Sequence, residues 1–303
     1  MTELATDATA KMDIGQRTRQ EDAVIADFSQ GARLGLAVLS DGMGGHEDGD
    51  LASRVIAGEM FGELFFSAAR PDALLHDAPT TFQHALSVAN RKLRNQAKAG
   101  VLSDTSGGTL VSVAVVGGQL HWISVGDSPL YLYRDKTLRR LNEDHSMAPQ
   151  IDMMVREGLI DDEEGRNHPQ RNCLTSAVTG ADIHKVDCPL TPTPLMAGDI
   201  IILASDGINT LPDEGILALT RRYRHKDSQQ IARELMNAVH SVGSPDQDNT
   251  SVVVIKMQDQ AHKHRSALSN FARDISTATD ERYTRVMTSL GQAFRPKTRH
   301  VGS

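Results

Sequence analysis

The chain has 303 residues, 39% of them hydrophobic and 23% charged, which is typical of a folded globular protein with a buried core. Its formal net charge of −7 argues against nucleic acid as the main partner, because phosphate backbones select basic protein surfaces. A phosphorylated substrate remains compatible with this charge, since a bound divalent cation can reverse the local sign.

The N-terminal half begins with a predicted strand and continues with two predicted helices. The run "RLGLAVLS", residues 33–40, is apolar throughout most of its length and predicts a buried strand that ends at Ser40. Residues 51–65 and 81–98 then carry apolar side chains at helical spacing, which predicts two amphipathic helices.

The middle of the chain predicts two hairpins. "TLVSVAVV" (109–116) and "QLHWISVG" (119–126) are rich in strand-forming residues and are joined by Gly117-Gly118. Two glycines accept the positive φ of a tight hairpin turn. A second hairpin is predicted over residues 129–141, with its turn near Asp135-Lys136.

The remaining predicted elements leave strands and helices in separate groups along the chain. They are a short helix in 147–160, a strand in 198–207, a helix over 228–240 and a strand over 249–257. Strands and helices do not alternate as βαβ units, which favours antiparallel sheet covered by helices. From about residue 260 the sequence is basic and short of strand signals, and we expect a tail outside the core.

Lone carboxylates lie at the ends of several predicted strands. They are Asp41, Asp127, Asp206 and Asp248, and the pair Glu21 and Asp22 precedes a further short apolar run. Any one of these aspartates alone is more typical of an ordinary turn, and Asp-Gly is the commonest hairpin dipeptide. If the whole set converged at one sheet edge, however, its repulsion would be severe without cations. Mg²⁺ or Mn²⁺ would relieve it, since both prefer carboxylate, carbonyl and water oxygens.

Eight sequence blocks, in order, resemble the metal-dependent Ser/Thr protein phosphatases of type 2C, in their bacterial form. The blocks are "DIGQRTRQED", "LSDGMGGHEDG", "SGGTLVSVAV", "SVGDSPLYLYR", "LNEDHS", "EEGRNHPQRNCLTSAVTG", "GDIIILASDGINTL" and "DQDNTSVVVI". The resemblance implies an α+β fold, a four-layer α/β/β/α sandwich of two antiparallel sheets flanked by helices. We therefore expect an N-terminal extension (1–10), a catalytic domain (11–258) and a basic C-terminal tail (259–303).

The resemblance also implies a ligand set for two Mn²⁺ or Mg²⁺ ions. Asp41 would bridge both ions, and the Gly42 carbonyl would bind the second. Asp206 and Asp248 would be the other protein ligands of the first ion. The implied reaction is hydrolysis of phosphoserine and phosphothreonine in proteins by a hydroxide that bridges the two metals.

Four further positions match residues with roles in the family. Glu21 and Asp22 would hold the second ion directly or through its waters, and Asp127 matches the position of a third, weaker metal. Arg17 matches the residue that binds the substrate phosphate, a role that suits the guanidinium fork. With Asp41 and Asp206, Arg17 forms the expected catalytic set.

The sequence departs from the family pattern at three positions. Animal members have a histidine, a candidate proton donor, where this chain has Met43, so water or another group must protonate the leaving group. Pro129 and Ser176 stand where arginine is usual, which predicts weaker anchoring of the loops near the site. His46 is either a proton shuttle or a surface histidine, and we favour the second interpretation.

Residues 147–175 correspond to the mobile flap of bacterial members. The stretch "GRNHPQRN" is polar and rich in turn formers, as in a surface loop. Our hypothesis is that the flap orients the phosphoprotein substrate and that His168 and Arg171 help to order it.

Other classes of phosphate enzyme fit the sequence less well. A C-x₅-R motif is missing, because Thr179 and Pro194 occupy the arginine positions after Cys173 and Cys188. No P-loop motif occurs, and one His76-Asp77 pair is weak support for an HD-type phosphohydrolase. The main alternative is a catalytically weak protein of this fold that acts as a binding or scaffold protein in a kinase signalling pathway.

Partners and location follow from the same features. The two cysteines form no CxxC pair, which argues against a disulfide framework or a zinc site. No signal peptide and no apolar run of about 18 residues occur, so we expect a cytoplasmic protein without a transmembrane segment. The expected partner is a phosphoprotein, with a Ser/Thr kinase or its targets as candidates, and the expected state is a monomer.

Overall fold

The computed structural model describes residues 4–29, 34–44, 48–67 and 71–259. Residues 6–258 form one compact unit, and the fold below is that of this unit. A second unit combines residues 1–5 with 259–303, of which only 4, 5 and 259 are described. His46 and nearly all of the predicted basic tail therefore lie outside the described residues.

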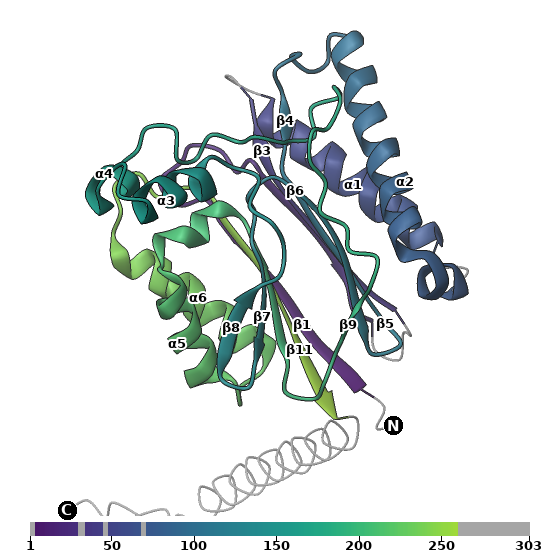
Figure 1. Cartoon of the computed structure of the whole chain (residues 1–303). Coiled ribbons are helices and arrows are strands. Elements are labelled where there is room, and N and C mark those ends of the chain that lie inside the picture. Colours follow the sequence, from purple (N-terminus) through teal and green to yellow (C-terminus); the bar gives the residue numbers. More distant parts are fainter. Residues whose placement is uncertain (1–3, 30–33, 45–47, 68–70, 260–303) are drawn as a thin grey trace, which may run out of the picture. The chain divides into compact units, whose positions relative to one another are not determined.

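Within the described residues, the strands form two sheets (Figure 1). The six-stranded sheet contains β2 (Asp22–Asp27), β3 (Leu34–Met43), β5 (Leu110–Val116), β6 (Gln119–Val125) and β9 (Thr193–Pro194) in that order, with the short β4 (Gly107–Gly108) paired to β3. The five-stranded sheet has the order β1 (Leu4–Asp13), β11 (Thr250–Asp259), β10 (Ile200–Ala204), β7 (Leu130–Arg134) and β8 (Thr137–Arg140).

Helices cover the outer face of each sheet. α1 (Gly49–Ser67) and α2 (Pro71–Lys98) pack on the six-stranded sheet around a core that includes Ile56, Phe82 and Ile123. α5 (Asp213–Tyr223) and α6 (Ser228–Val242) pack on the five-stranded sheet around Ile202, Ile216 and Leu235.

The two sheets pack against each other between these helical layers. Every residue of β5 and of β10 is buried, so both faces of each strand are covered. The layers therefore follow the order helix, sheet, sheet, helix (Figure 1), and the predicted four-layer α/β/β/α sandwich is confirmed.

The predicted hairpins are both present. Gly117 and Gly118 have φ of 58° and 73° between β5 and β6. Asp135 and Lys136 have φ of 50° and 66° between β7 and β8. These positive values match the tight turns that suit the twist of paired strands.

Several boundaries differ from the sequence prediction. β3 does not end at Ser40 but continues through Asp41 to Met43, because Asp41 pairs with Asp22 and Met43 pairs with Gly107. β1 begins at Leu4, inside the stretch that we expected to precede the domain.

Two helices were not predicted. α4 (Asp162–Arg166) forms in the polar stretch because Asp161 and Glu164 make a reciprocal capping box. α5 begins after Pro212. Among the described residues, no helix combines the length and the apolar character that a membrane span requires.

Candidate metal centre

The predicted carboxylates lie at or near the ends of strands from both sheets. Asp22 on β2 lies directly opposite Asp41 on β3. Asp206 begins the 3₁₀ helix η1 (Asp206–Thr210), immediately after β10 and Ser205. Asp248 lies two residues before the start of β11, and Asp127 lies two residues after the end of β6.

Five of the predicted carboxylates meet at one open cavity of about 660 Å³, whereas the buried Asp22 is not among its lining residues. Glu21, Asp41, Asp127, Asp206 and Asp248 all line it. The convergence that the sequence required for a metal site is therefore present at one end of the paired sheets.

Burial and mutual repulsion raise the pKa of these carboxyls. Burial is the largest cause for Asp41, followed by the charges of Asp206 and Asp22. Burial also raises the pKa of Asp206, with the charge of Asp248 as the next cause. The cluster therefore holds its negative charge at a cost that bound cations would offset.

The pKa of three further carboxyls is also raised. Burial raises the pKa of Asp22 to about 6, although the nearby hydroxyl groups of Ser251 and Ser205 act to lower it. Burial and then the charge of Asp206 raise the pKa of Asp127 to about 7. The pKa of Glu21 is also raised, mainly by burial.

The donor atoms fit hydrated divalent cations. Asp22 Oδ1 and Asp206 Oδ1 are buried and have no hydrogen-bond partner, so each has a lone pair free for a ligand. Among the described residues, no three His, Cys, Asp or Glu side chains are grouped tightly enough to hold an ion by themselves. Carboxylate and carbonyl oxygens are nevertheless the donor types that Mg²⁺ and Mn²⁺ prefer, and Mg²⁺ commonly keeps several waters while it binds through one or two carboxylates.

The backbone beside the carboxylates is tightly packed. A Cβ added at Gly42 would collide with the carbonyl oxygens of Gly49 and Glu21. One added at Gly207 would collide with the carbonyl of Asn249. Glycine after Asp41 and after Asp206 is therefore a steric requirement of this packing.

Buried hydroxyl groups hold the carboxylates in place. Ser205 Oγ donates to Asp22 Oδ2 at 2.8 Å. Thr109 Oγ1 accepts from the Asp41 backbone N–H at 3.0 Å and lies 2.7 Å from Ser128 Oγ. Thr109 therefore links Asp41 to the loop that carries Asp127.

Asn249 is a supporting residue that the sequence analysis missed. Its Oδ1 accepts from the Glu21 N–H at 2.7 Å, and its Nδ2 donates to the carbonyls of Ile14 at 2.8 Å and Arg19 at 2.9 Å. Asn249 thus fastens the loop of Glu21 beside Asp248. The only sequence signal was its position next to Asp248 in the "DN" block.

Arg17 lies at the cavity on this loop. Its Nη2 contacts Asp248 Oδ2 at 2.7 Å, and 57% of its side chain is exposed. The guanidinium is therefore both near the carboxylates and accessible to an anion from solvent.

A sequence model of the family described as Protein phosphatase 2C matches residues 11–247. The chain belongs to this family. The Serine/threonine protein phosphatase PstP of Mycobacterium tuberculosis is 31% identical over 244 residues, which are 80% of this chain and 43% of that protein. The chain thus spans less than half the length of PstP. The Serine/threonine phosphatase stp of Listeria monocytogenes is 30% identical over 239 residues, 77% of this chain and 88% of that protein.

Solved structures share the fold of this chain. The catalytic domain of PstP, in complex with two manganese ions, superposes with a TM-score of 0.68 at 29% identity, over 85% of this chain and all of that one. PppA of Pseudomonas aeruginosa, described as a key regulatory component of T6SS, gives 0.65 at 27% identity, over 84% of this chain and all of that one.

Residues 147–175, the predicted flap, contain α3 (Ala148–Arg156) and α4. Arg171 Nη1 contacts Asp152 Oδ1 on α3 at 2.6 Å and the carbonyl of Gly165 on α4 at 3.4 Å. His168 Nδ1 accepts only from the nearby Gln170 N–H at 3.2 Å among the contacts described. Neither residue lines the cavity, whereas the returning segment 172–177 does.

The departures from the type 2C pattern are visible in the site. Met43 lines the cavity, as expected from its position. Pro129 is buried, and its carbonyl accepts from the Ala204 N–H at 3.0 Å. Ser176 Oγ donates to the Lys185 carbonyl at 2.9 Å and accepts from the Lys185 N–H at 2.9 Å, so it fastens the cavity wall to the residue that follows His184.

Proposed function

We propose that this protein hydrolyses phosphoserine and phosphothreonine in proteins with the help of two Mn²⁺ or Mg²⁺ ions. The observation that carries the proposal is the convergence of buried carboxylates from both sheets on one open cavity. When bound, such ions lower the pKa of water and offset the charge of a phosphate. Membership of the type 2C family and the named phosphatase relatives support the same activity.

The ligand assignment is part of this proposal. Asp41 would serve both ions, with Asp206 and Asp248 on the first and the Gly42 carbonyl on the second. Glu21 and Asp22 would hold the second ion, directly or through its waters. The free lone pairs of Asp22 Oδ1 and Asp206 Oδ1 support these roles. Asp127 would hold a third ion, in keeping with its place on the cavity wall.

Arg17 would bind and orient the phosphate of the substrate. Its accessible guanidinium can donate two parallel hydrogen bonds to two phosphate oxygens. The leaving alkoxide takes its proton from water or another lining group, since the thioether of Met43 carries none.

We further propose that the flap orients the protein part of the substrate and that Arg171 orders the flap. Replacing Arg171 with Gln removes its ion pair with Asp152. KM for a phosphothreonine peptide should rise about two- to fivefold, the effect of losing roughly 0.5–1 kcal/mol. A small aryl phosphate should be hydrolysed at the wild-type rate, and Arg166→Gln on the exposed surface of α4 is the matched control. Equal effects on both substrates would contradict the flap role.

The proposed activity is tested by phosphate release from a phosphothreonine peptide across a Mn²⁺ titration. We expect turnover that rises with Mn²⁺ and disappears when a chelator is present. A parallel Mg²⁺ titration establishes which ion the protein prefers. Turnover that is unaffected by the chelator would contradict the metal-dependent mechanism.

A scaffold protein with the same fold is the alternative from the sequence. A rise in thermal stability with Mn²⁺, without turnover of any phosphopeptide, would favour that alternative. The proposed partner is a phosphorylated protein, with a Ser/Thr kinase or its targets as candidates. The proposed setting is a monomer in the cytoplasm of a bacterium, with residues 11–258 as the catalytic domain.

A further inference from the structure

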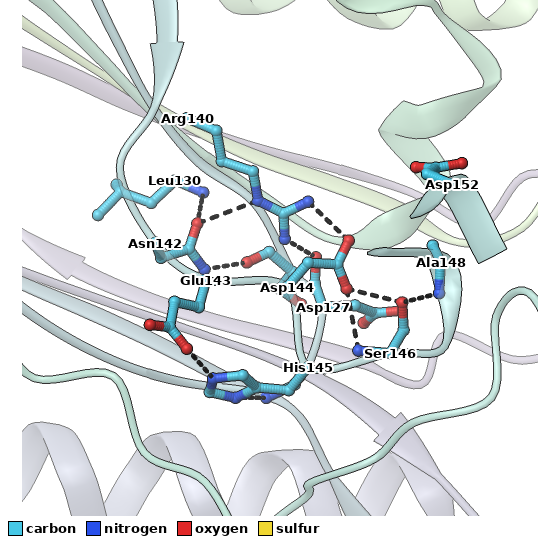
Figure 2. Close-up of polar contacts among 12 residues, drawn as sticks. Asp127, Leu130, Arg140, Asn142, Glu143, Asp144, His145, Ser146, Ala148 and Asp152 are labelled. Atoms are coloured by element: carbon cyan, nitrogen blue, oxygen red, sulfur yellow. Dashed lines mark hydrogen bonds and ion pairs between the residues drawn. The ribbon is translucent and has the colours of Figure 1, made fainter. Parts of the chain in front are cut away.

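The guanidinium of Arg140 binds the loop that carries Asp127. Arg140 is the last residue of β8, and a quarter of its side chain is exposed. Its Nη2 donates to the Asp127 carbonyl oxygen at 2.6 Å, and its Nη1 contacts Asp144 Oδ2 at 3.0 Å (Figure 2). One planar side chain therefore joins a residue of the candidate metal centre to a residue just before the flap.

Asn142 holds the same loop from a second direction. Its Nδ2 donates to the Ser128 carbonyl at 2.9 Å, and its Oδ1 accepts from the Leu130 N–H at 2.8 Å (Figure 2). Arg140 Nε also points to this Oδ1 at 3.4 Å. Together the two side chains bind the backbone at three positions, Asp127, Ser128 and Leu130. We call residues 126–130 the Asp127 turn.

From Asp144 the contacts continue into the flap. Asp144 Oδ1 accepts from the backbone N–H of Ser146 at 3.0 Å and from its Oγ at 2.7 Å. Ser146 Oγ in turn accepts from the N–H of Ala148, the first residue of α3, at 3.1 Å (Figure 2). The hydrogen bonds thus form an unbroken path from Arg140 to the start of the flap helix.

The flap begins and ends at a short paired segment. The Thr175 N–H donates to the His145 carbonyl at 2.7 Å, and the Met147 N–H donates to the Cys173 carbonyl at 3.0 Å. We call residues 145–147 and 173–175 the flap base. Because residues 173–175 line the cavity, the position of the flap base determines the position of that wall.

His145 attaches the flap base to the Asp127 turn. Its backbone N–H donates to the Gly126 carbonyl at 3.0 Å, and its Nδ1 accepts from the Gly126 N–H at 3.2 Å. The Asp127 turn and the flap base are therefore joined twice, through His145 and through Arg140 with Asp144.

We propose that Arg140 is a positioning residue that couples the Asp127 turn to the flap base. It sets the distance between the carboxylates and the opposite wall of the cavity without itself lining that cavity. Pro129 stands directly after the "GDS" block, where arginine is usual in the family. In this chain Arg140, at the end of β8, is the arginine that binds this loop. The effect on catalysis rests on the proposed phosphatase function, whereas the coupling does not.

Amide hydrogen exchange on the full-length protein tests the coupling without any need for turnover. In Arg140→Gln, exchange at the flap base should become about tenfold faster, because the path to Asp144 is lost. Exchange in β10 should stay at its wild-type rate. Arg139→Gln is the matched control, since Arg139 is the adjacent residue of β8 with an exposed side chain and the same charge change.

Turnover of a phosphothreonine peptide provides the second measurement. We expect kcat/KM to fall by roughly tenfold or more in Arg140→Gln, to recover in part in Arg140→Lys, and to stay unchanged in Arg139→Gln. Wild-type exchange at the flap base in Arg140→Gln would overturn the proposal. So would equally faster exchange in β10 and the flap base, since that would reveal a merely structural role. If the wild-type protein released no phosphate, the proposed function would fail while the exchange comparison still decided the coupling.

Discussion

Replacing Asp206 with Asn should reduce metal-dependent phosphate release by about a thousandfold, the scale of losing several kcal/mol of electrostatic stabilisation. Asp206 lies next to Asp41 and Asp248, and its Oδ1 is buried without a hydrogen-bond partner. The amide keeps the size of the side chain but removes its charge, so the loss should appear in turnover and not in folding. Assays at several Mn²⁺ concentrations would show whether excess metal restores any activity.

The same substitution should stabilise the metal-free protein, which distinguishes a ligand from a structural carboxylate. Without cations, the negative charges around Asp206 repel one another, so the melting temperature in chelator should rise by about 2–4 °C for each kcal/mol relieved. Asp199→Asn is the contrasting control, because Asp199 is buried in an ion pair with Arg134 at 2.6 Å and lines no part of the cavity. It should lower the melting temperature and leave kcat unchanged. Near-wild-type turnover in Asp206→Asn would contradict the metal assignment.

The parts of the fold that depend on local chemistry were predictable from the sequence. Gly117-Gly118 predicted a tight turn because two adjacent positive φ angles exclude most other residues, and the structure has that turn. The Ser-Asp-Gly stretch at Asp206 predicted the end of a strand, and β10 does end at Ala204. The equivalent prediction at Asp41 was wrong, because pairing with β2 and β4 extends β3 past it.

Contacts between distant segments could not be predicted in this way. Asn249 binds Ile14, Arg19 and Glu21, more than 200 residues earlier in the chain. A single asparagine after an aspartate carries no periodicity that would reveal such partners. The same holds for Arg140, which resembles any charged residue at the end of a hairpin until the fold brings it to Asp127. Motif order therefore identified the carboxylates, whereas only the structure shows which side chains hold them in place.

The stability of the metal-free protein should decrease as the pH rises from 5.5 to 8. The folded-state pKa of Asp127 is raised to about 7 and that of Asp22 to about 6, from an ordinary value of 3.8. Between the ordinary and the raised value the folded protein binds more protons than the unfolded chain, so stability is gained as the pH falls through this window. At about 1.4 kcal/mol for each pKa unit, these two groups account for roughly 2–3 kcal/mol between pH 8 and 5.5.

Two buried histidines have the opposite effect on the pH dependence of stability. Burial lowers the pKa of His121 and His145, so their contribution to stability is lost as the pH falls below the ordinary histidine value of 6.5. The total pH profile therefore mixes two effects, and a variant is needed to separate them.

Asp127→Asn isolates the carboxylate contribution, because the pKa of Asp127 is raised further than that of Asp22 and the substitution leaves both histidines in place. In chelator at pH 8 this variant should be more stable than the wild type by about 2–4 kcal/mol, since burial and the charge of Asp206 no longer act on an ionised group. About 2 kcal/mol of this advantage should disappear by pH 5.5, where the wild-type carboxyl is protonated in the folded state, and the rest should be lost only as the pH approaches the ordinary value of 3.8. Thermal unfolding of both proteins at pH 5.5, 6.5, 7.5 and 8.5, with chelator and with Mn²⁺, measures the difference directly.

Because Mn²⁺ stabilises the folded state to which it binds, it should raise the melting temperature of the wild type and flatten its pH dependence. An equal advantage of the variant at every pH would mean that charge repulsion at Asp127 is not what the cation offsets.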